Sequence, residues 1–270
     1  MHIVVVSHPK GGVAKTTSVT SLAGALVERG HRVLAVDLDP QGSLTLALGH
    51  IPQEVQASIV DVLQYRLPLQ EAILSTEVPG LDVVAATTQL RHAQRDLKSQ
   101  DSYTLLRSFF RPWASQAAYD YVLVDTPPGQ DLLTLNALIM ADQVLIPTQP
   151  EYFSAYALRY LLQAIRWVRL RFQPALAYRA FLTMYQPRYR AHKWIRARLE
   201  VTLGPGLCST TIPVDTKIRE AAIAGLPVTH YAPRSRAAQA YRALAQEVFA
   251  YEPLSIPRRV EETVGGASAS

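Results

Sequence analysis

HIVVVSHPKGGVAKTT (residues 2–17) is the stretch of this sequence that decides the fold. Its first part, HIVVVS (2–7), is a short apolar and β-branched run, which is typical of a strand buried in a parallel sheet. Gly11 and Gly12 then interrupt the run, and apolar residues with helical spacing occupy 16–29. A strand that turns through glycine into a helix presents free backbone N–H groups at the positive end of the helix dipole, where a phosphate binds well.

Side chains within PKGGVAKTT (9–17) complete this phosphate loop. Lys15 can reach the β- and γ-phosphates of a nucleotide, and the Thr16 hydroxyl is placed to bind Mg²⁺. Pro9 and Ala14 occupy the two glycine positions of the common pattern G-x-x-x-x-G-K-[ST], and the form that matches is KGG-x-x-K-[ST]-[ST]. Ala14 is compatible with such a loop if its φ stays negative. The residues expected to bind the nucleotide are Gly11, Gly12, Val13, Ala14, Lys15, Thr16 and Thr17.

The rest of the chain alternates between strand and helix patterns. Further strands are predicted at 31–39, 81–87, 121–129, 143–150 and 180–187. Further helices are predicted at 89–98, 101–116, 130–141, 153–172, 190–203, 215–224 and 234–251. Alternation of this kind predicts an α/β fold, with a mostly parallel, twisted sheet and helices on both faces. We expect a single P-loop domain over residues 1–251 and a disordered C-terminal tail over 252–270.

Composition limits the classes of protein to which the chain can belong. Of 270 residues, 49% are hydrophobic and 18% are charged, which suits a buried core and not a disordered chain. No apolar stretch reaches the ~18 residues that a membrane-spanning helix needs, and residues 1–7 read as a strand instead of a signal peptide. Cys208 is the only cysteine, which excludes an internal disulfide framework and favours a cytoplasmic location. We expect Cys208 to be a small core residue.

Two of the predicted strands end in acidic residues. Asp37 and Asp39 follow the second strand in DLDPQGS (37–43), and Asp125 ends the apolar run YVLVD (121–125), which is the Walker B pattern. Ligands of parallel sheets bind beyond the carboxyl ends of the strands, so these carboxylates are expected beside the phosphate loop. Mg²⁺ prefers oxygen ligands, and a carboxylate there can hold the metal or position an attacking water. The predicted metal site comprises Thr16, Asp39 and Asp125.

These motifs resemble those of one known group of proteins. KGG-x-x-K-T-T, DLDPQGS and the TPPG that follows Asp125 are similar to the motifs of the ParA/MinD group of deviant Walker A P-loop ATPases, and DLDPQGS resembles the ParA-like partition branch. The resemblance continues through residues 136–154 and 212–241. It implies an enzyme that binds ATP and Mg²⁺, hydrolyses ATP to ADP and phosphate, and forms a homodimer around ATP.

The resemblance also implies roles for individual residues. In the group, the first lysine of the loop, here Lys10, crosses the dimer interface to the partner's nucleotide, and Lys15 holds the phosphates of its own. Asp39 stands where the group has the residue that orients or activates water, and Asp37 supports the metal and the loop from behind. Pro213 is expected beside the adenine.

Basic residues are concentrated in one part of the chain. The net charge is +5, and residues 152–199 contain no Asp or Glu. RYRAHKWIRAR (188–198) combines six basic residues, counting His192, with Tyr189 and Trp194. No motif for reading base edges is present, so we predict binding to double-stranded DNA without sequence preference. By resemblance to ParA-like proteins, the expected DNA contacts are Arg188, Arg190, Lys193, Lys217 and Arg219.

The function implied by the resemblance is a positioning switch. ATP joins two subunits into a DNA-binding dimer, and hydrolysis stimulated by a ParB-like adaptor releases it from the nucleoid, which segregates a plasmid or chromosome. A protein cargo is an alternative, and so is a MinD-like division-site regulator, although residues 252–270 lack the amphipathic face of a membrane helix. Metabolic relatives form a third class. Those of the nitrogenase iron protein need paired cysteines, and amide-forming synthetases need a substrate pocket. His8 and His92 lie in no metal-spaced cluster and are expected in packing or at the surface.

Overall fold

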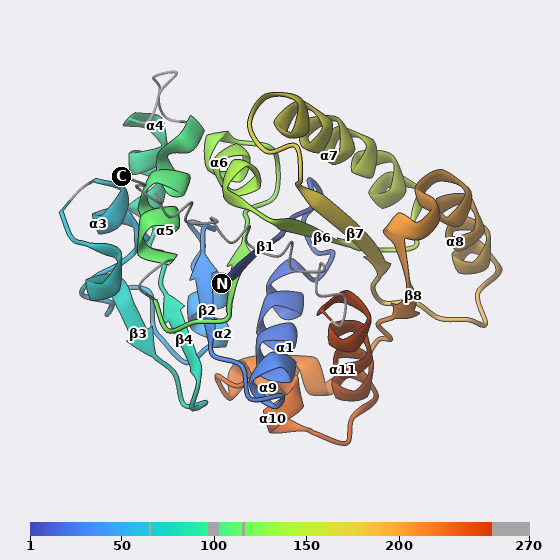
Figure 1. Ribbon diagram of the computed structural model, residues 1–270. Coiled ribbons are helices and arrows are strands. Elements are labelled where there is room, and N and C mark those ends of the chain that lie inside the picture. Colours follow the sequence, from blue (N-terminus) through green and yellow to red (C-terminus); the bar gives the residue numbers. More distant parts are fainter. Residues whose placement is uncertain (65, 97–102, 115–116, 250–270) are drawn as a thin grey trace, which may run out of the picture.

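An eight-stranded sheet forms the centre of this computed structural model, which describes residues 1–64, 66–96, 103–114 and 117–249 (Figure 1). The strands are β1 His2–Val6, β2 Val33–Asp37, β3 Ile73–Ser75, β4 Leu81–Val84, β5 Tyr121–Asp125, β6 Gln143–Thr148, β7 Ala177–Leu182 and β8 Leu207–Thr211. Their order across the sheet is β3-β4-β2-β5-β1-β6-β7-β8. All neighbouring pairs are parallel except β3 with β4, so the prediction of a mostly parallel sheet is confirmed.

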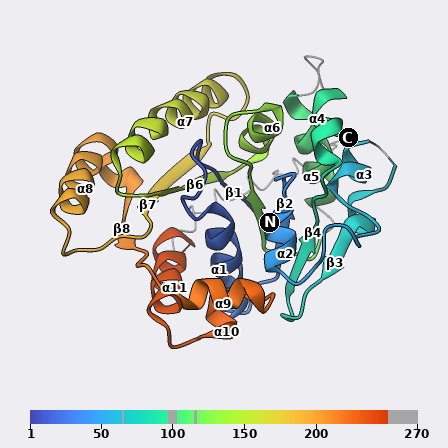
Figure 2. The same ribbon diagram turned by 180° about the vertical axis from the view of Figure 1, so that it is seen from behind.

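Helices cover both faces of this sheet. They are α1 Lys15–Val27, α2 Ser43–Ala47, α3 Ile59–Leu63, α4 Leu90–Asp96, α5 Leu105–Ala114, α6 Leu132–Met140, α7 Tyr152–Arg171, α8 Arg190–Leu203, α9 Lys217–Ile223, α10 Val228–Tyr231 and α11 Arg236–Phe249, with short 3₁₀ turns at Leu69–Ala72 and Gly204–Gly206. Figures 1 and 2 show α6 and α7 on one side of the sheet and α1 and α11 on the other. None of the helices in the described ranges is long and apolar enough to cross a membrane.

The strands are buried on both faces because their side chains alternate between two cores. In β1, Ile3 and Val5 belong to the core under α3 to α8, while Val4 and Val6 belong to the core under α1, α2 and α9 to α11. All four side chains are fully buried. Each such valine or isoleucine contributes about 1.5–3 kcal/mol relative to an exposed position. The continuous apolar run that predicted this strand therefore reflects its place near the middle of the sheet.

The six predicted strands are all present, whereas two further strands were missed. Both β3 and β8 lie at edges of the sheet, where half-exposed strands need no continuous apolar run. The prediction that the fourth strand extends to residue 129 is wrong. Asp125 is the last paired residue, and Pro127 and Pro128 have no N–H with which to continue the ladder. Cys208 is buried in β8, as expected of a core residue.

Each predicted helix has a counterpart in the structure, and the structure contains three further short helices that were not predicted. The missed helices α2, α3 and α10 have four or five residues each, too few to show helical periodicity. Parts of three predicted helices, at 97–98, 101–102, 115–116 and 250–251, and the predicted tail at 252–270 lie outside the described residues.

Gly24 of α1 packs closely against α10 and the proline that precedes it. A Cβ on Gly24 would lie 2.6 Å from the Pro227 Cβ and closer still to the Thr229 Oγ1. We expect Gly24→Ala to destabilise the protein by about 1–3 kcal/mol through overpacking, although alanine is by about 1 kcal/mol the better helix former. Urea unfolding of the two proteins tests this, and an unchanged or higher midpoint would show that α10 moves aside freely.

Candidate functional site

The predicted phosphate loop connects β1 to α1 at the carboxyl edge of the sheet. In the sheet register, Val6 at the end of β1 pairs with Asp125, and Asp125 pairs with Asp37 at the end of β2. The loop and both acids therefore meet at one edge, as the sequence predicted. The switch segment TPPG joins them, because the Gly129 N–H donates to the Pro9 carbonyl at 3.0 Å.

Two residues of the loop adopt the left-handed conformation. Gly12 has φ +75° and Ala14 has φ +71°. Ala14 therefore does not meet the condition of a negative φ under which an alanine fits such a loop without strain. It is the N-cap of α1, and its carbonyl accepts both the N–H and the hydroxyl of Ser18. Left-handed backbone costs a non-glycine residue roughly 1–2 kcal/mol. Strain of this kind concentrates at functional sites, where the surrounding structure enforces it.

The ends of β6 and β7 hold the loop in place. The Gln149 side chain donates to the Gly12 carbonyl at 3.0 Å, and the Thr183 hydroxyl donates to the Val13 carbonyl at 3.1 Å. Gln149 also contacts the sulfur of Met184, at 2.9 Å, and Met184 is itself left-handed with φ +53°. The loop is thus fixed from neighbouring strands as well as by its own sequence.

The two lysines of the loop have different surroundings. Lys15 is buried, its ammonium donates to the Lys10 carbonyl at 3.3 Å, and burial lowers its pKa although Asp125 and Asp39 oppose this shift. The Lys10 ammonium is partly exposed and pairs with Glu151 at 2.6 Å, just before α7. The two lysines therefore serve different positions, one inside the loop and one on its outer side.

His8 supports the loop from beneath. Its Nδ1 accepts the backbone N–H of Lys10 at 3.0 Å, and its Nε2 lies 3.5 Å from the Ser154 hydroxyl. Burial, followed by the charge of Lys15, lowers the pKa of His8 to about 4, so the ring is neutral at physiological pH. The expectation that His8 serves packing is confirmed, and His92 is exposed.

Asp125 is the acid closest to the loop helix. The Thr16 hydroxyl donates to its Oδ2 at 2.5 Å, whereas its Oδ1 is buried without a hydrogen-bond partner among the described residues. Burial and, next, the charge of Asp37 raise its pKa well above the usual range. A buried, unsatisfied carboxylate oxygen beside a threonine hydroxyl fits Mg²⁺, which binds oxygen ligands and keeps several of its waters. Thr16 and Asp125 are thus the residues that would hold the ion.

The other two acids have distinct environments. Asp37 is fully buried, accepts the N–H and the hydroxyl of Thr45 and the N–H of Asp39, and burial raises its pKa to about 6. Asp39 is half-buried, and its Oδ1 accepts the Gln41 N–H at 2.9 Å. Its Oδ2 has no hydrogen-bond partner within the described part of the chain. Asp37 is therefore bound into the fold, while Asp39 keeps one oxygen available for a water molecule.

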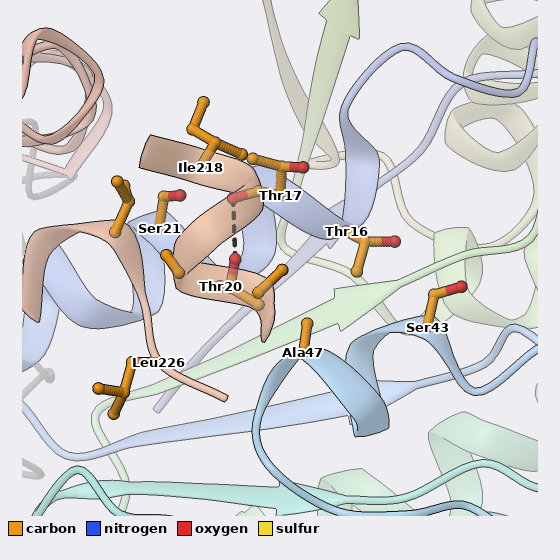
Figure 3. Close-up of a pocket in the computed structure, with 11 residues that line it drawn as sticks. Thr16, Thr17, Thr20, Ser21, Ser43, Ala47, Ile218 and Leu226 are labelled. Carbon is orange, nitrogen blue, oxygen red and sulfur yellow. Dashed lines mark hydrogen bonds between the residues drawn. The ribbon is translucent and has the colours of Figure 1, made fainter. Parts of the chain in front are cut away.

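A small cavity of about 150 Å³ lies beside the loop helix (Figure 3). Hydroxyl groups of α1 line one side of it, those of Thr16, Thr17 and Thr20 among them, and Ile218 of α9 lines another. Thr20 donates to the Thr17 carbonyl at 3.0 Å, so its hydroxyl is already satisfied. The helix that carries Lys217 and Arg219, α9, therefore lies across this cavity from α1, the helix of the phosphate loop.

Pro213, the predicted adenine contact, lies farther along the same edge of the sheet than the phosphate loop. Pro213 is half-buried and follows Ile212. The Ile212 N–H donates a hydrogen bond to the carbonyl of Leu182 at the end of β7, and the Ile212 carbonyl accepts one from the Tyr185 N–H. This places Pro213 at the same edge of the sheet, beyond β7 and β8. Its contact with adenine stays a prediction.

The predicted DNA-contacting residues form two separate groups. Arg188, Arg190 and Lys193 are exposed at the start of α8, which lies beside β8 (Figure 1). Lys217 and Arg219 are on α9, which lies near α1, and Lys217 is paired with Glu220 at 2.7 Å. One subunit therefore does not bring the two groups together.

Sequence reasoning missed several residues that organise the site. Gln149, Glu151 and Thr183 hold parts of the loop, and Thr45 holds Asp37. The available signal was the position of the first three directly after strands, where ligand-binding residues of parallel sheets gather. The arrangement as a whole defines a P-loop nucleotide site.

Comparison with known proteins identifies the family. The family described as AAA domain matches residues 1–178. Chromosome partitioning protein ParA of Caulobacter vibrioides is 34% identical over 255 residues, covering 93% of this chain and 95% of its own. Sporulation initiation inhibitor protein Soj of Bacillus subtilis is 36% identical over 252 residues, covering 92% of this chain and 98% of its own.

A solved structure agrees with these relatives. Cobyrinic acid a,c-diamide synthase from Mycobacterium smegmatis, with bound ADP and magnesium, has a TM-score of 0.79 and 30% identity, covering 91% of this chain and 93% of that chain. The chain belongs to the ParA/Soj/MinD family of deviant Walker A P-loop ATPases.

Asp125 offers a test of the electrostatics of this site. Because burial raises its pKa, the folded state binds more protons than the unfolded state, and stability falls as pH rises above the unfolded value. We expect Asp125→Asn to remove this loss. Its melting temperature should equal that of the unsubstituted protein near pH 4 and exceed it by an increasing margin as the pH rises to 8.

Asp120→Asn is the matched control for this test. Asp120 precedes the same strand at its other end, and its side chain is 54% exposed. Its substitution should give no stabilisation that grows with pH. Thermal melts of the three proteins across this pH range are the measurement, and a lower melting temperature for Asp125→Asn at pH 8 would contradict the assignment of an uncompensated buried charge.

Proposed function

We propose that this chain is an ATP-dependent, dimerising partition ATPase that binds DNA without sequence preference. The observation that carries the proposal is the loop itself, with Lys15 buried at its centre, Lys10 on its outer side, and Asp125 beside Thr16 with one oxygen unsatisfied. The names of the relatives support it, since two of them are a chromosome partitioning protein and the sporulation regulator Soj.

The residues of the phosphate loop and its neighbouring acids are suited to bind ATP and to promote its hydrolysis. Backbone N–H groups at the start of α1 and the Lys15 ammonium bind the phosphates. Mg²⁺, held by Thr16 and Asp125, would neutralise charge that develops on the phosphate oxygens. Asp39 orients the attacking water through its available oxygen, and Asp37 fixes the backbone of Asp39.

Dimerisation follows from the position of Lys10. A lysine on the outer side of its own loop is suited to reach a nucleotide in a second copy of the chain, which is its role in the family. In this structure Glu151 and Gln149 hold the ammonium within its own subunit, at 2.6 and 3.4 Å. Formation of the dimer therefore has to break this ion pair.

DNA binding is proposed from charge. Arg188, Arg190, Lys193, Lys217 and Arg219 are all exposed, and a dimer would present each of them twice. Contacts from lysine and arginine to phosphate release counterions and need no particular base sequence. Hydrolysis, stimulated by a ParB-like adaptor, then separates the subunits and releases them from DNA. Repeated cycles of binding and release would segregate a plasmid or chromosome. The protein would accordingly be cytoplasmic and, in its ATP-bound form, associated with the nucleoid.

Two other functions remain as alternatives. A ParA-like ATPase can position a protein cargo with the same machinery, and co-purification of the cargo from cells distinguishes the two. The Mycobacterium smegmatis structure bears the name of an amide-forming enzyme. A small-molecule amide as product, instead of DNA-stimulated ATP hydrolysis, would favour that class.

The proposed switch predicts opposite effects for two substitutions. Asp39→Ala should block hydrolysis without removing the phosphate contacts, and so trap a dimer that stays on DNA in ATP. Lys15→Ala should abolish nucleotide binding and leave a monomer. Light scattering with ATP or ADP and co-sedimentation with random-sequence DNA are the measurements. An Asp39→Ala protein that remains monomeric and free of DNA in ATP would refute the proposal.

The Lys10–Glu151 pair gives a finer prediction. Both side chains are partly exposed, at 34% and 54%, so the pair is worth at most about 1 kcal/mol. Glu151→Gln frees Lys10, and the ATP concentration for half-maximal dimerisation should fall by a factor of about 2–5. Glu200→Gln, which breaks an exposed pair with Arg196 on α8, should leave it unchanged. Weaker dimerisation of Glu151→Gln would mean that Glu151 acts across the interface instead.

A further inference from the structure

One face of α8 carries a large, exposed aromatic side chain, for which the proposed contacts between basic residues and DNA phosphates give no role. Trp194 is 64% exposed, and Arg190 and Arg198 lie four residues before and after it. Residues spaced by four share a face of a helix, so the three side chains form a stripe along α8. Ile195, Leu199 and Leu203 are buried and belong to the core under α8. The stripe Arg190–Trp194–Arg198 therefore points away from the core.

The charge of this face is uncompensated. Glu200 is the only acid of α8, and it pairs with Arg196 at 2.8 Å. Within the described part of the chain, no carboxylate lies within ion-pair distance of Arg190, Lys193 or Arg198. A partner for this face must then supply negative charge close to both ends of the stripe and an apolar surface at its middle.

The dimensions of the stripe match a nucleic-acid duplex. The helix rises by about 12 Å between Arg190 and Arg198, which is about the width of the major groove. Phosphates flank the groove, and the C–H faces of the deoxyribose rings that join them offer an apolar surface, whereas the base edges within the groove carry hydrogen-bond donors and acceptors. A protein surface would have to place acids at the same separation on both sides of an apolar patch, so a duplex is the simpler complement.

We propose that Trp194 is a DNA-binding residue, whose indole packs on the sugar edge of double-stranded DNA while Arg190 and Arg198 contact phosphates on either side. This inference rests on the proposed function and adds to it an uncharged contact. Such a contact releases no counterion, so it contributes affinity without contributing to the dependence of that affinity on salt.

The salt dependence of binding separates this contact from the ionic ones. Fluorescence anisotropy with a labelled random-sequence duplex is measured from 50 to 200 mM salt, in ATP, with every variant made in the Asp39→Ala background. Trp194→Ala should weaken binding by roughly tenfold at each salt concentration and leave the slope of log K against log salt unchanged. Trp194→Phe should recover most of the affinity.

Two further variants complete the comparison. Arg198→Gln should reduce the slope by about one for each phosphate that the protein no longer neutralises. Leu170→Ala removes an exposed side chain of similar character from the end of α7, at 76% exposure, and should change neither affinity nor slope. Dimerisation in ATP, measured in parallel, shows that each variant is folded.

The outcomes distinguish this inference from the function on which it rests. If the unsubstituted protein binds DNA and Trp194→Ala binds it equally well, the inference is wrong and the proposed function stands. If Trp194→Ala keeps its affinity for DNA and, in a protein that retains Asp39, loses the stimulation of ATP hydrolysis by the adaptor, the stripe is a protein-binding surface, and the inference is wrong again. If the Asp39→Ala protein with Trp194 intact does not bind DNA even at 50 mM salt, both the inference and the proposed function are wrong.

Discussion

The hydrogen bond from Thr16 to Asp125 connects the first turn of α1 to the end of β5, and the rest of the site depends on it. It fixes where the helix begins relative to the sheet, and with it the direction in which the loop N–H groups point. It also leaves the second oxygen of Asp125 buried and unsatisfied, next to the buried Asp37. Two buried carboxylates side by side, with Lys15 as the nearest cation, are unfavourable in a protein interior.

The fold therefore maintains at this edge an arrangement that costs stability. Ala14 adds to the cost, because it adopts a left-handed conformation that glycine would adopt without strain. Local rules of sequence and structure are commonly broken at functional sites and compensated elsewhere. Here the compensation is the pair of apolar cores on the two faces of the sheet, which hold β1, β2 and β5 in register whatever their ends carry.

Features that are local in the sequence could be predicted, and contacts between distant segments could not. The phosphate loop lies within nine consecutive residues, and Asp37 and Asp125 each end an apolar run, so pattern and position were sufficient. The contacts of Gln149 and Glu151 with the loop join residues 137 and 141 positions apart. They depend on β6 lying beside β1, an order across the sheet that strand patterns alone do not specify. The sequence left the φ of Ala14 open, and the structure places it in the left-handed region.

The surroundings of Cys208 have a chemical consequence for a protein proposed to associate and separate repeatedly. Burial raises the pKa of its thiol to about 11, although Arg179 opposes the shift. The thiolate is the form that attacks disulfides and is oxidised, and very little of it exists in the folded chain at neutral pH. Cross-linking of two copies through this buried sulfur is therefore disfavoured. The proposed dimer would thus not be locked by a disulfide between the two copies of Cys208.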